Sequence, residues 1–267
     1  MPSAKTRSRI ITLTTDFGVS DHFVGTMKGV ILAIAPKASI VDITHDIAPF
    51  EILEGAFTIA QAAPYFPQGT VHVVVVDPGV GTARRPILAE ASGQYFIGPD
   101  NGVFSMVYDC GSHRVRSISN SKLFLPEVSR TFHGRDVFAS AAAHLAGGLA
   151  PARFGKLIAD YVQLGLLKPL QTARTAWSGT VLKVDHFGNL ITNFRVERFP
   201  ELRNGSFEVS VGLRRIIGVS ETFGDCIPGE PNVIVGSSGY LEVVVREGSA
   251  AKTMGCGAGA PVEIIFY

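Results

Sequence analysis

The sequence has little charge of either sign and almost no excess of one sign over the other. Its 267 residues include 24 lysines and arginines and 23 aspartates and glutamates, for a formal net charge of +1. Charged residues make up 18% of the chain, against about 25% in an average globular protein. Without a basic excess to neutralise a phosphate backbone, nucleic acid is not expected as a partner. Hydrophobic residues make up 46%, which excludes a disordered chain.

Long hydrophobic runs are missing as well. No apolar run approaches the roughly 18 residues that a membrane span needs, so no membrane association is expected. The N-terminal segment 1–9 is short and basic, and the apolar segment 10–13 that follows is too brief for the core of a secretion signal. A cytoplasmic protein is therefore expected.

Cysteine is scarce, and histidine lacks the spacing of metal sites. The three cysteines, Cys110, Cys226 and Cys256, are far apart, odd in number and form no CxxC pair. The seven histidines form no HxH or HExxH pattern. The sequence therefore predicts neither a disulfide framework nor a metal site.

Strand and helix signals alternate in the first half of the chain. Apolar residues at helical spacing follow Ser20, an expected N-cap, and end at Pro36. The run Val71–Val76 reads VHVVVV, which is typical of a strand buried on both faces. Further strands are predicted at 10–15 and 40–43, a strand pair at 87–91 and 94–97, and further helices at 51–63 and 135–145. This alternation predicts an α/β fold with a mostly parallel sheet flanked by helices.

The second half contains short β-like runs separated by glycine and proline turns. These runs cover residues 180–184, 190–194, 207–211, 232–235, 240–245 and 262–266. They are typical of a small all-β barrel or sandwich. Segment 166–178 contains a proline, has no clear period and is interpreted as a linker. We therefore predict two domains, an N-terminal α/β domain at 1–172 and a smaller C-terminal β domain at 173–267.

Polar residues follow several predicted strands, at the edge where open parallel sheets bind ligands. The segments are TTDFG at 14–18, THD at 44–46, DPGVGTARR at 77–85 and, before a helix, FHGRD at 132–136. Each has a purely structural alternative. Asp16 is also typical of a turn carboxylate, Arg84 of a surface charge and His133 of a structural histidine, while Asp136 favours a helix start.

The glycines of segment 77–85 match neither common nucleotide-binding loop. No GK[ST] follows them, so they do not form a phosphate loop. Arg84 stands where a dinucleotide fingerprint needs its third glycine, and Pro86 excludes a helix at that point.

Five runs occur together in one order: TTDFG (14–18), DITHDI (42–47), DPGVGTARR (77–85), FHGRD (132–136) and FGNLITN (187–193). With them the sequence resembles the S-adenosyl-L-methionine (SAM) hydroxide adenosyltransferase family, the adenosine-forming SAM hydrolases. The resemblance extends from Ile11 to about Ile265. This family is related to the fluorinase and chlorinase enzymes. The substrate is implied by the resemblance and not by composition or spacing.

The resemblance implies cleavage of SAM to adenosine and L-methionine, with water or hydroxide attacking the ribose C5′. The family places an Asp, an Arg and a His around that water, and the matching catalytic positions are Asp77, Arg84 and His133. Arg84 stays protonated, so we expect it to bind the oxygen and not to act as a base. Asp77 would orient Arg84 or the water, and His133 would complete the network or take the proton. Because the leaving group is a neutral thioether, neither a metal nor a cofactor is expected.

Three positions differ from the related halogenases. Asp77 stands where fluorinase-like enzymes carry a tyrosine, Val80 where they carry a threonine, and Gly134 where they use a halide-contacting serine. A buried halide favours neutral or positive donors, so we expect water as the nucleophile. A SAM-dependent halogenase and a non-catalytic adenosine- or SAM-binding protein are the alternatives.

The resemblance also implies the residues that bind substrate. Asp16 matches a carboxylate that accepts from both ribose hydroxyls, and Asn189 matches the amide that reads adenine. Some relatives carry an arginine where this chain has Ser238. The other matching positions are Phe50 beside the substrate, Phe187 and Phe223 against adenine, Asp185 for the methionine ammonium, Ser237 near the methionine carboxylate or adenine, and Tyr240 and Glu247 as further contacts.

The family is trimeric, and each of its sites lies between the N-terminal domain of one subunit and the C-terminal domain of the next. The resemblance therefore implies a homotrimer with inter-subunit active sites. The order of the residues agrees with this, because the ribose and water residues precede residue 172 and the adenine and methionine residues follow it.

Overall fold

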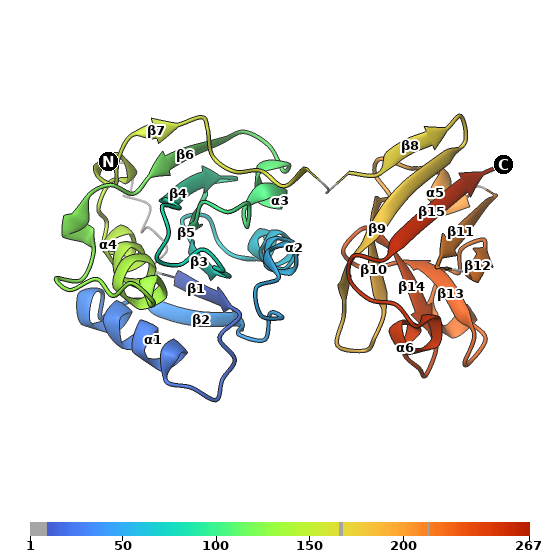
Figure 1. Ribbon diagram of the computed structural model, residues 1–267, viewed down its shortest axis with the longest axis horizontal. Helices are drawn as coiled ribbons and strands as arrows, with labels where there is room; N and C mark the ends of the chain where they lie inside the picture. The colour runs from blue at the N-terminus through green and yellow to red at the C-terminus, as the bar shows by residue number, and fades with distance from the viewer. Residues whose placement is uncertain (1–9, 166–167, 205, 213) are drawn as a thin grey trace, which may run out of the picture. The chain divides into compact units, whose positions relative to one another are not determined.

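The structure is a computed structural model, and it describes residues 10–165, 168–204, 206–212 and 214–267. The chain divides into two compact units, Met1–Leu164 and Gly165–Tyr267 (Figure 1). The predicted boundary near residue 172 lies within strand β8 (Leu170–Ala173), which pairs with β9 (Ala176–Val184) of the C-terminal unit. The basic segment 1–9 lies outside the described residues.

The linker interpretation of segment 166–178 is wrong for most of its length, because β8 and the start of β9 occupy it. All four side chains of β8 are exposed, so the strand lacks the apolar alternation that would have revealed it. Residues 166–167 of that segment lie outside the described residues.

The described part of the N-terminal unit contains a seven-stranded sheet in the order β2-β1-β3-β5-β4-β6-β7. Pairing is parallel from β2 to β5 and antiparallel from β5 to β7. The predicted α/β fold is confirmed, with parallel pairing joining β2, β1, β3 and β5. The strands are β1 (Ile10–Thr15), β2 (Ser39–Thr44), β3 (Val71–Val75), β4 (Pro86–Ala91), β5 (Gln94–Pro99), β6 (His113–Ser117) and β7 (Leu157–Ile158).

The change from parallel to antiparallel pairing has a local cause at the predicted strand pair. Ser92 and Gly93 connect β4 to β5 with φ angles of 50° and 75°. Two successive positive φ angles define the tight hairpin turn whose twist matches that of the paired strands. Ala91 pairs with Gln94 across this turn, so β4 is antiparallel to β5.

Helices cover both faces of this sheet, and β3 contributes to the core on each face. All five residues of β3 are buried, as predicted. Val71 and Val73 pack with Met27 and Ile31 of α1 (Phe23–Ile34), while Val74 packs in a second cluster. That second cluster includes residues of α2 (Ile52–Ala62) and α3 (Ser105–Tyr108). The alternation along β3 thus divides its apolar side chains between the two core clusters. Figure 1 shows α1 and α4 (Ser140–Ala146) on one side of the sheet and α2 and α3 on the other.

The helix predicted at 135–145 is present but not uniform. It begins as a π-helix, η3 (Gly134–Ala139), and continues as α4 (Ser140–Ala146). Alanines of α4 are fully buried in the same core cluster as α1. A π-helical turn is uncommon and occurs frequently at functional sites, and this one directly follows His133. The remaining short 3-10 turns of this unit are η1 (Ala63–Tyr65), η2 (Ser121–Leu123) and η4 (Pro151–Arg153).

The described part of the C-terminal unit is built on an eight-stranded antiparallel sheet in the order β12-β11-β15-β9-β10-β14-β13, with β8 pairing to β9. An isolated bridge between Ser220 and Ile234 brings the two ends of this order together, so the sheet is nearly closed into a barrel. The predicted all-β domain is confirmed. The remaining strands are β10 (Leu190–Arg195), β11 (Phe207–Val211), β12 (Arg214–Ile217), β13 (Pro231–Val235), β14 (Tyr240–Val245) and β15 (Pro261–Phe266).

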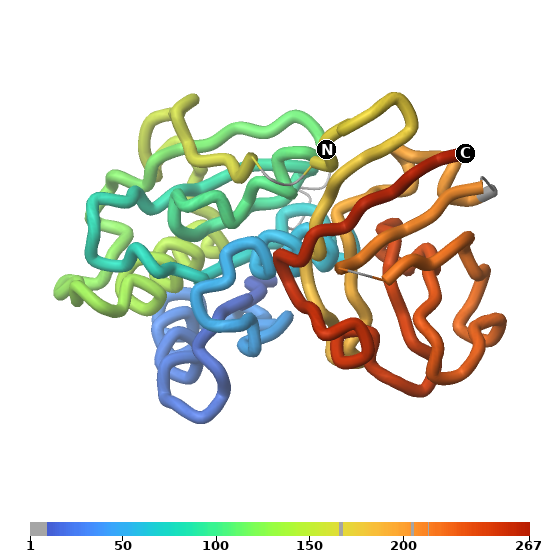
Figure 2. The backbone as a smooth tube through the Cα atoms, turned by 45° about the vertical axis from the view of Figure 1, so that its right-hand side comes forward, coloured from blue at the N-terminus to red at the C-terminus, as the bar shows by residue number. Residues whose placement is uncertain are grey.

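The last strand joins two distant parts of the C-terminal unit. β15 pairs with β9 on one side and β11 on the other, and Figure 2 shows it in red beside the yellow β9. Its inward residues Val262 and Ile264 are fully buried with Phe194 and Phe207 in the barrel core. The short helices given for the described residues of this unit lie outside the strands: α5 (Glu201–Asn204), η6 (Phe223–Asp225) and α6 (Ala250–Met254).

Candidate active site

The loops that follow β1, β2 and β3 and the start of η3 enclose a cavity of about 280 Å³ in the N-terminal unit. Carboxyl ends of parallel strands meet at one edge of a sheet, which explains why these loops come together. Four residues predicted for the site line this cavity: Asp16, Phe50, Asp77 and His133. The other lining residues are Phe17, Phe23, Pro49, Val75, Val80, Thr131, Phe132 and Gly134.

Asp16 follows β1 directly and is half-buried. Its Oδ2 accepts a hydrogen bond from the backbone N–H of Phe50 at 2.9 Å. Phe50 adopts a positive φ of 71°, an unusual conformation for a bulky residue, and its ring is 68% exposed. Burial, together with the charge of Asp77, raises the pKa of Asp16 above its ordinary value.

The loop after β3 turns tightly before it reaches Arg84. Val80 N–H donates to the Asp77 carbonyl at 3.2 Å, and Thr82 N–H to the Gly79 carbonyl at 3.1 Å. Gly81 has a φ of 79°, and a Cβ atom there would lie 2.6 Å from the carbonyl oxygen of Arg130. Only glycine permits this close approach, so the glycines of the motif shape a tight turn that returns Arg84 to Asp77.

Arg84 is the centre of the predicted catalytic trio. Its Nε donates to Asp77 Oδ1 at 3.0 Å, and its Nη2 donates to Asp77 Oδ2. The Nη2 atom also lies 2.9 Å from Nδ1 of His133. The guanidinium carbon lies 5.1 Å from the ring centroid of Phe138. The Arg84 and Asp77 side chains are only 8% and 5% exposed, so this charged pair is buried.

The third nitrogen of this guanidinium, Nη1, differs from the other two in its contacts. Nη1 of Arg84 is buried and has no hydrogen-bond partner within the described part of the chain. A buried donor without a partner is costly, and such atoms in folded proteins call for a ligand or a water molecule. Nη1 is therefore suited to bind an oxygen atom through a charge-assisted hydrogen bond.

The contact between Arg84 and His133 determines the protonation of the imidazole. A guanidinium only donates, so Nδ1 of His133 accepts, and the neutral ring carries its hydrogen on Nε2. Burial and the positive charge of Arg84 lower the pKa of His133 below its ordinary value. In this arrangement His133 is neutral near pH 7 and has one N–H available as a donor.

All three positions that the resemblance contrasts with halogenases, Asp77, Val80 and Gly134, line the same cavity. A Cβ atom at Gly134 would lie 3.2 Å from two ring carbons of Phe17. A serine at this position would therefore require the Phe17 ring to move. Phe17, Phe23 and Phe132 pack edge to face with ring centroids 5.1–5.9 Å apart.

A second cavity, of about 540 Å³, belongs to the C-terminal unit. Four of the predicted substrate-binding residues line it: Phe187, Asn189, Phe223 and Glu247. Val245 and Gly248 complete the lining. Phe187 is 74% exposed and Phe223 is 46% exposed, so two aromatic rings border this cavity with much of their surface accessible.

Asp185 organises the turn that carries Phe187 and Asn189. Its Oδ1 accepts from the N–H groups of Phe187 at 2.9 Å and Asn189 at 2.8 Å, and its Oδ2 accepts from Nδ2 of Asn189 at 2.8 Å. Phe223 is held by a capping box in which Thr222 and Asp225 bond reciprocally. Both aromatic positions are thus fixed by local hydrogen bonds.

Four predicted binding residues of the C-terminal unit, Asp185, Ser237, Ser238 and Tyr240, are not among the residues that line this cavity. Ser237 is exposed in the turn between β13 and β14, and Ser238 Oγ lies 3.4 Å from Oε1 of Glu242. Tyr240 is buried, with the guanidinium of Arg195 5.4 Å from its ring centroid. Conversely, the sequence predicted only Phe50 of the four phenylalanines in the N-terminal cavity, and Phe17, Phe23 and Phe132 were missed. Phe23 sits at helical spacing with core residues, so its pattern gave no separate signal.

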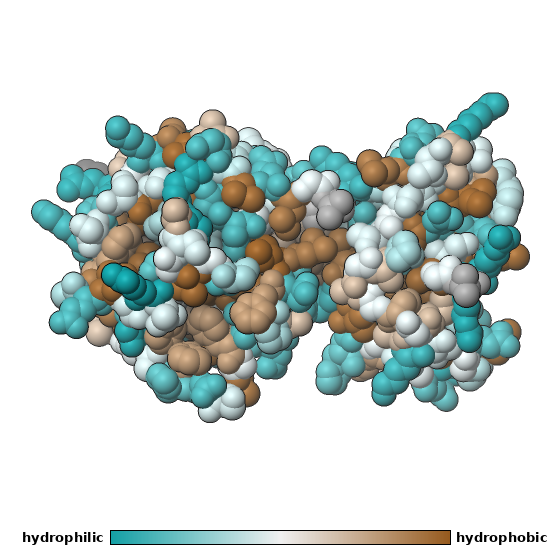
Figure 3. All heavy atoms as spheres, viewed as in Figure 1, coloured by the Kyte–Doolittle hydropathy of each residue, from teal (hydrophilic) through white to brown (hydrophobic). Residues whose placement is uncertain are grey.

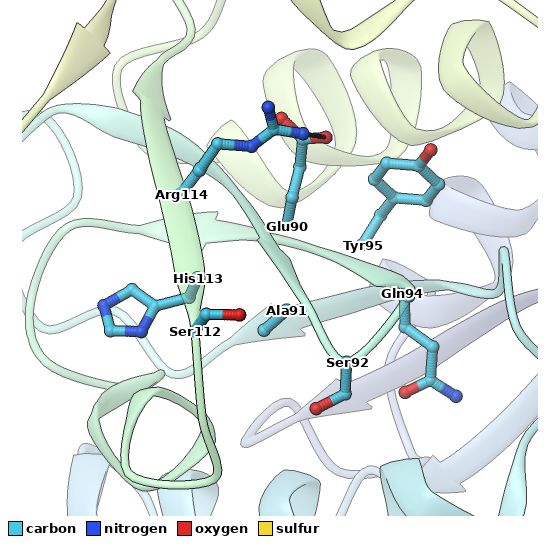
Figure 4. Close-up of a pocket in the computed structure, with 9 residues that line it drawn as sticks. Glu90, Ala91, Ser92, Gln94, Tyr95, Ser112, His113 and Arg114 are labelled. Carbon is cyan, nitrogen blue, oxygen red and sulfur yellow. Dashed lines mark hydrogen bonds and ion pairs between the residues drawn. The ribbon is translucent and has the colours of Figure 1, made fainter.

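Another cavity, of about 500 Å³, lies beside the β4–β5 hairpin and contains no predicted site residue. Figure 4 shows Arg114 against Glu90 in this cavity, and their charged groups approach to 3.2 Å. His113 bonds to Tyr161 at 2.6 Å. The main polar groups of this cavity already have protein partners, so the cavity is a weaker candidate for a site than the two cavities above.

The described residues contain neither a cluster of metal ligands nor a membrane-spanning helix. No group of three or more histidine, cysteine, aspartate or glutamate side chains is placed to bind a metal ion within the described ranges. Among the same residues, no helix combines the length and the apolar character that crossing a bilayer requires.

Comparison with known proteins connects the two cavities to one family. Residues 11–155 match the SAM hydroxide adenosyltransferase N-terminal domain, and residues 179–263 match the C-terminal domain. The chain belongs to the SAM hydroxide adenosyltransferase family. The resemblance inferred from the five sequence runs is thereby confirmed.

Relatives of this family include a hydrolase and a more distant halogenase. The chain is 39% identical to the (R)-S-adenosyl-L-methionine hydrolase of Thermus thermophilus, covering 96% of this chain and 100% of that protein. It is 29% identical to the fluorinase of an Actinoplanes species, and the match covers 96% of this chain and 97% of that protein. An uncharacterized conserved protein from Thermotoga maritima matches with a TM-score of 0.88 and 38% identity, covering 96% and 99%.

Proposed function

We propose that this protein hydrolyses S-adenosyl-L-methionine to adenosine and L-methionine, breaking a carbon–sulfur bond. One observation carries the proposal. Arg84 is fixed by Asp77 and His133, keeps one buried donor nitrogen without a partner in the described chain, and has both of its partners lining the cavity that contains Asp16. This arrangement suits an enzyme that binds a solvent oxygen beside a ribose.

The nucleophile in this proposal is a hydroxide bound to Nη1 of Arg84. The guanidinium lowers the pKa of the bound water through a charge-assisted hydrogen bond, and the proton passes to bulk solvent before attack. The hydroxide oxygen then forms a bond to C5′ of the ribose. The C5′–S bond breaks, and its electron pair stays on sulfur, which leaves as the neutral thioether of methionine.

His133 serves as a hydrogen-bond donor in this proposal and not as the base. Its Nδ1 already accepts from Arg84, so its Nε2–H is free to donate to the nucleophilic oxygen. Taking up a proton at Nδ1 would break the contact with Arg84 and place two positive groups side by side. Asp77 orients Arg84 through both of its oxygens. Neither metal nor cofactor is required, because a sulfonium is already a good leaving group.

Substrate binding is divided between the two cavities. Asp16 accepts from the two ribose hydroxyls, whose adjacent donors match its two carboxylate oxygens. Asn189 uses one N–H for Asp185, which leaves its other N–H and its carbonyl oxygen for the adenine edge. Phe187 and Phe223 pack against the adenine, and Asp185 lies beside the methionine ammonium. Ser237, Ser238, Tyr240 and Glu247 remain proposed contacts.

We further propose a homotrimer in which each active site combines the N-terminal cavity of one subunit with the C-terminal cavity of another. Neither cavity alone contains the full set of residues for ribose, water, adenine and methionine. Exposed aromatic rings at Phe50 and Phe187 support the pairing of two surfaces. Apolar side chains are also visible on the face of both units in Figure 3.

The substrate in this proposal is the (R) epimer at the sulfonium, which the names of the hydrolase relatives specify. We place the reaction in the cytoplasm. The three cysteines are unpaired, which fits a reducing compartment.

Separate incubation of the enzyme with the (R) and (S) sulfonium epimers tests the proposal. We expect adenosine and L-methionine from the (R) epimer, with one ¹⁸O atom from labelled water at the 5′ position of adenosine and no effect of a chelator. Chloride or fluoride added in a parallel reaction should yield no 5′-halo product. Adenosine bound tightly without turnover, or a halide-dependent product, would instead support one of the two alternatives.

A further inference from the structure

His45 belongs to the THD segment after β2, which the proposed mechanism does not use. Its side chain is 5% exposed, and it lies between the carboxyl ends of β1 and β2. Buried histidines are commonly structural, so the question is what this one holds in place.

The contacts of His45 lie on both sides of Asp16 in the sequence. Its Nδ1 is 2.9 Å from the hydroxyl of Thr15, the residue before Asp16. Its carbonyl oxygen accepts from the N–H of Gly18 at 2.8 Å. Thr15 Oγ1 in turn accepts from the N–H of Phe17 at 3.3 Å. The backbone that carries Asp16 is therefore tied to one histidine before and after the carboxylate.

The direction of these hydrogen bonds follows from the other ring nitrogen. Nε2 of His45 lies 3.1 Å from Oδ1 of Asp42, and Lys28 Nζ lies 2.5 Å from Oδ2 of the same carboxylate. The alignment is not that of a hydrogen bond, but a nitrogen lone pair this close to a carboxylate would be repelled, so Nε2 carries a hydrogen. With that hydrogen on Nε2 of an uncharged imidazole, Nδ1 accepts from the Thr15 hydroxyl. Although burial raises the pKa of Asp42, the hydrogen bond from Lys28 and the close contact with His45 together outweigh burial and lower that pKa.

The geometry points to His45 as a positioning residue for Asp16, which it holds in the orientation that accepts both ribose hydroxyls. The inference rests on the proposed role of Asp16 in binding ribose. The same segment supplies Phe50, whose N–H binds Asp16 directly. Residues 44–50 thus form the support for the carboxylate, and His45 is the side chain that joins this support to β1.

Strand β1 offers a matched control three residues earlier. Thr12 Oγ1 lies 2.7 Å from Nδ1 of His72, which repeats the threonine–imidazole hydrogen bond of Thr15 and His45. Thr12 and Thr15 are both fully buried. His72 packs against Phe96 within the sheet and is not among the residues that line the Asp16 cavity. Thr12→Val and Thr15→Val therefore remove the same interaction from two places, only one of which supports Asp16.

The test measures SAM turnover and adenosine binding by calorimetry for the wild type and four variants. Thr15→Val and His45→Leu should raise KM and the adenosine Kd about tenfold with kcat changed less than about threefold. Thr12→Val should lower Tm by about as much as Thr15→Val does, but it should leave KM and the adenosine Kd unchanged. His45→Asn keeps an acceptor near the position of Nδ1, so it should recover part of the lost affinity.

Two results would overturn the positioning role. Equal KM values for Thr12→Val and Thr15→Val would reduce the Thr15–His45 pair to a fold-stabilising contact, as would a loss confined to kcat. The proposed function fails on a different measurement, since a wild-type enzyme that forms no adenosine refutes it before any variant is compared. Circular dichroism at the assay temperature ensures that only folded variants enter the comparison.

Discussion

Arg84 meets Asp77 at two points, with its Nε 3.0 Å from Oδ1 and its Nη2 donating to Oδ2. Two parallel hydrogen bonds fix the plane of the guanidinium as well as its position. Nη1 is then the terminal nitrogen that lacks a partner in the described chain, and its direction is set by the pair and not by solvent. The arrangement depends on the fork geometry that arginine has and lysine lacks.

Replacing Arg84 should therefore lower kcat far more than it raises KM. Arg84→Ala removes the group that lowers the pKa of the bound water and binds the attacking hydroxide. Donors to a charged oxygen in an active site are commonly worth about 100- to 1,000-fold in kcat. Arg84→Lys should lose nearly as much, because an ammonium cannot bond both Asp77 oxygens and also present a fixed donor. Steady-state kinetics with SAM measures both values.

The matched control for Arg84 is Arg114, which forms an exposed pair with Glu90. Exposed ion pairs contribute little, so Arg114→Ala should retain wild-type kcat and KM. A loss that appears only in KM for Arg84→Ala would contradict its role as the group that binds the nucleophile.

Asp16 is expected to show the opposite kinetic signature. Its carboxylate contacts ribose hydroxyls that do not react, so it binds ground state and transition state alike. Asp16→Ala should raise KM and the adenosine Kd roughly 10- to 100-fold, as expected for hydrogen bonds to a charged group. A kcat that falls while KM stays constant would assign Asp16 to the chemistry and not to binding.

The sequence predicted the buried parts of the fold better than its edges. Strand β3 was evident because a strand covered on both faces is apolar and β-branched throughout. Strands β8 and β12 were missed, since their side chains are largely exposed and carry no alternation. Strand β6, interrupted by arginines that pair with Glu90, was missed for a similar reason.

The candidate site was predicted from motifs at the ends of strands. The prediction of contacts succeeded where both residues belong to the same motif. The residues Asp77 and Arg84 belong to one short loop, so their contact follows from a tight turn. The contact of His133 with Arg84 spans 49 positions and came only from the family resemblance. The edge-to-face contacts of Phe17, Phe23 and Phe132 depend on the packing of α1 beside η3, which no local pattern contains.

The hydrogen bond from Arg84 to His133 should set part of the acid limb of the pH–rate profile. Protonation of Nδ1 would remove its acceptor and repel the guanidinium, so the active form has neutral His133. Since burial and Arg84 lower this pKa below its ordinary value of 6.5, the part of the acid limb that belongs to His133 should lie below pH 6.5. Deprotonation of the bound water adds a separate dependence on pH, which a variant without the imidazole retains.

His133→Asn provides the comparison for this acid limb. An asparagine oxygen can accept from Arg84 but does not titrate, so the variant should lose rate and also lose the limb that belongs to His133. An acid limb in His133→Asn that is identical to that of the wild type would remove His133 from this part of the mechanism.

Independently of catalysis, His72 should make the free energy of unfolding depend on pH below pH 6.5. Its side chain is fully buried between Thr12 and Phe96, and burial lowers its pKa from 6.5 to about 4. Between these values the unfolded chain binds a proton that the folded chain does not. The contribution of neutral His72 is therefore complete above pH 6.5 and is lost as the pH falls toward 4.

The size of this loss and its origin can both be measured by denaturant unfolding at several pH values. At about 1.4 kcal/mol per pKa unit, the free energy of unfolding should decrease by about 3 kcal/mol from pH 6.5 to 4 on account of His72. His72→Leu loses the bond to Thr12, so it should be less stable at pH 7, yet its stability should fall less steeply with acid. Parallel pH dependences in the two proteins would mean that His72 is protonated in the folded state, and that another buried group governs acid unfolding.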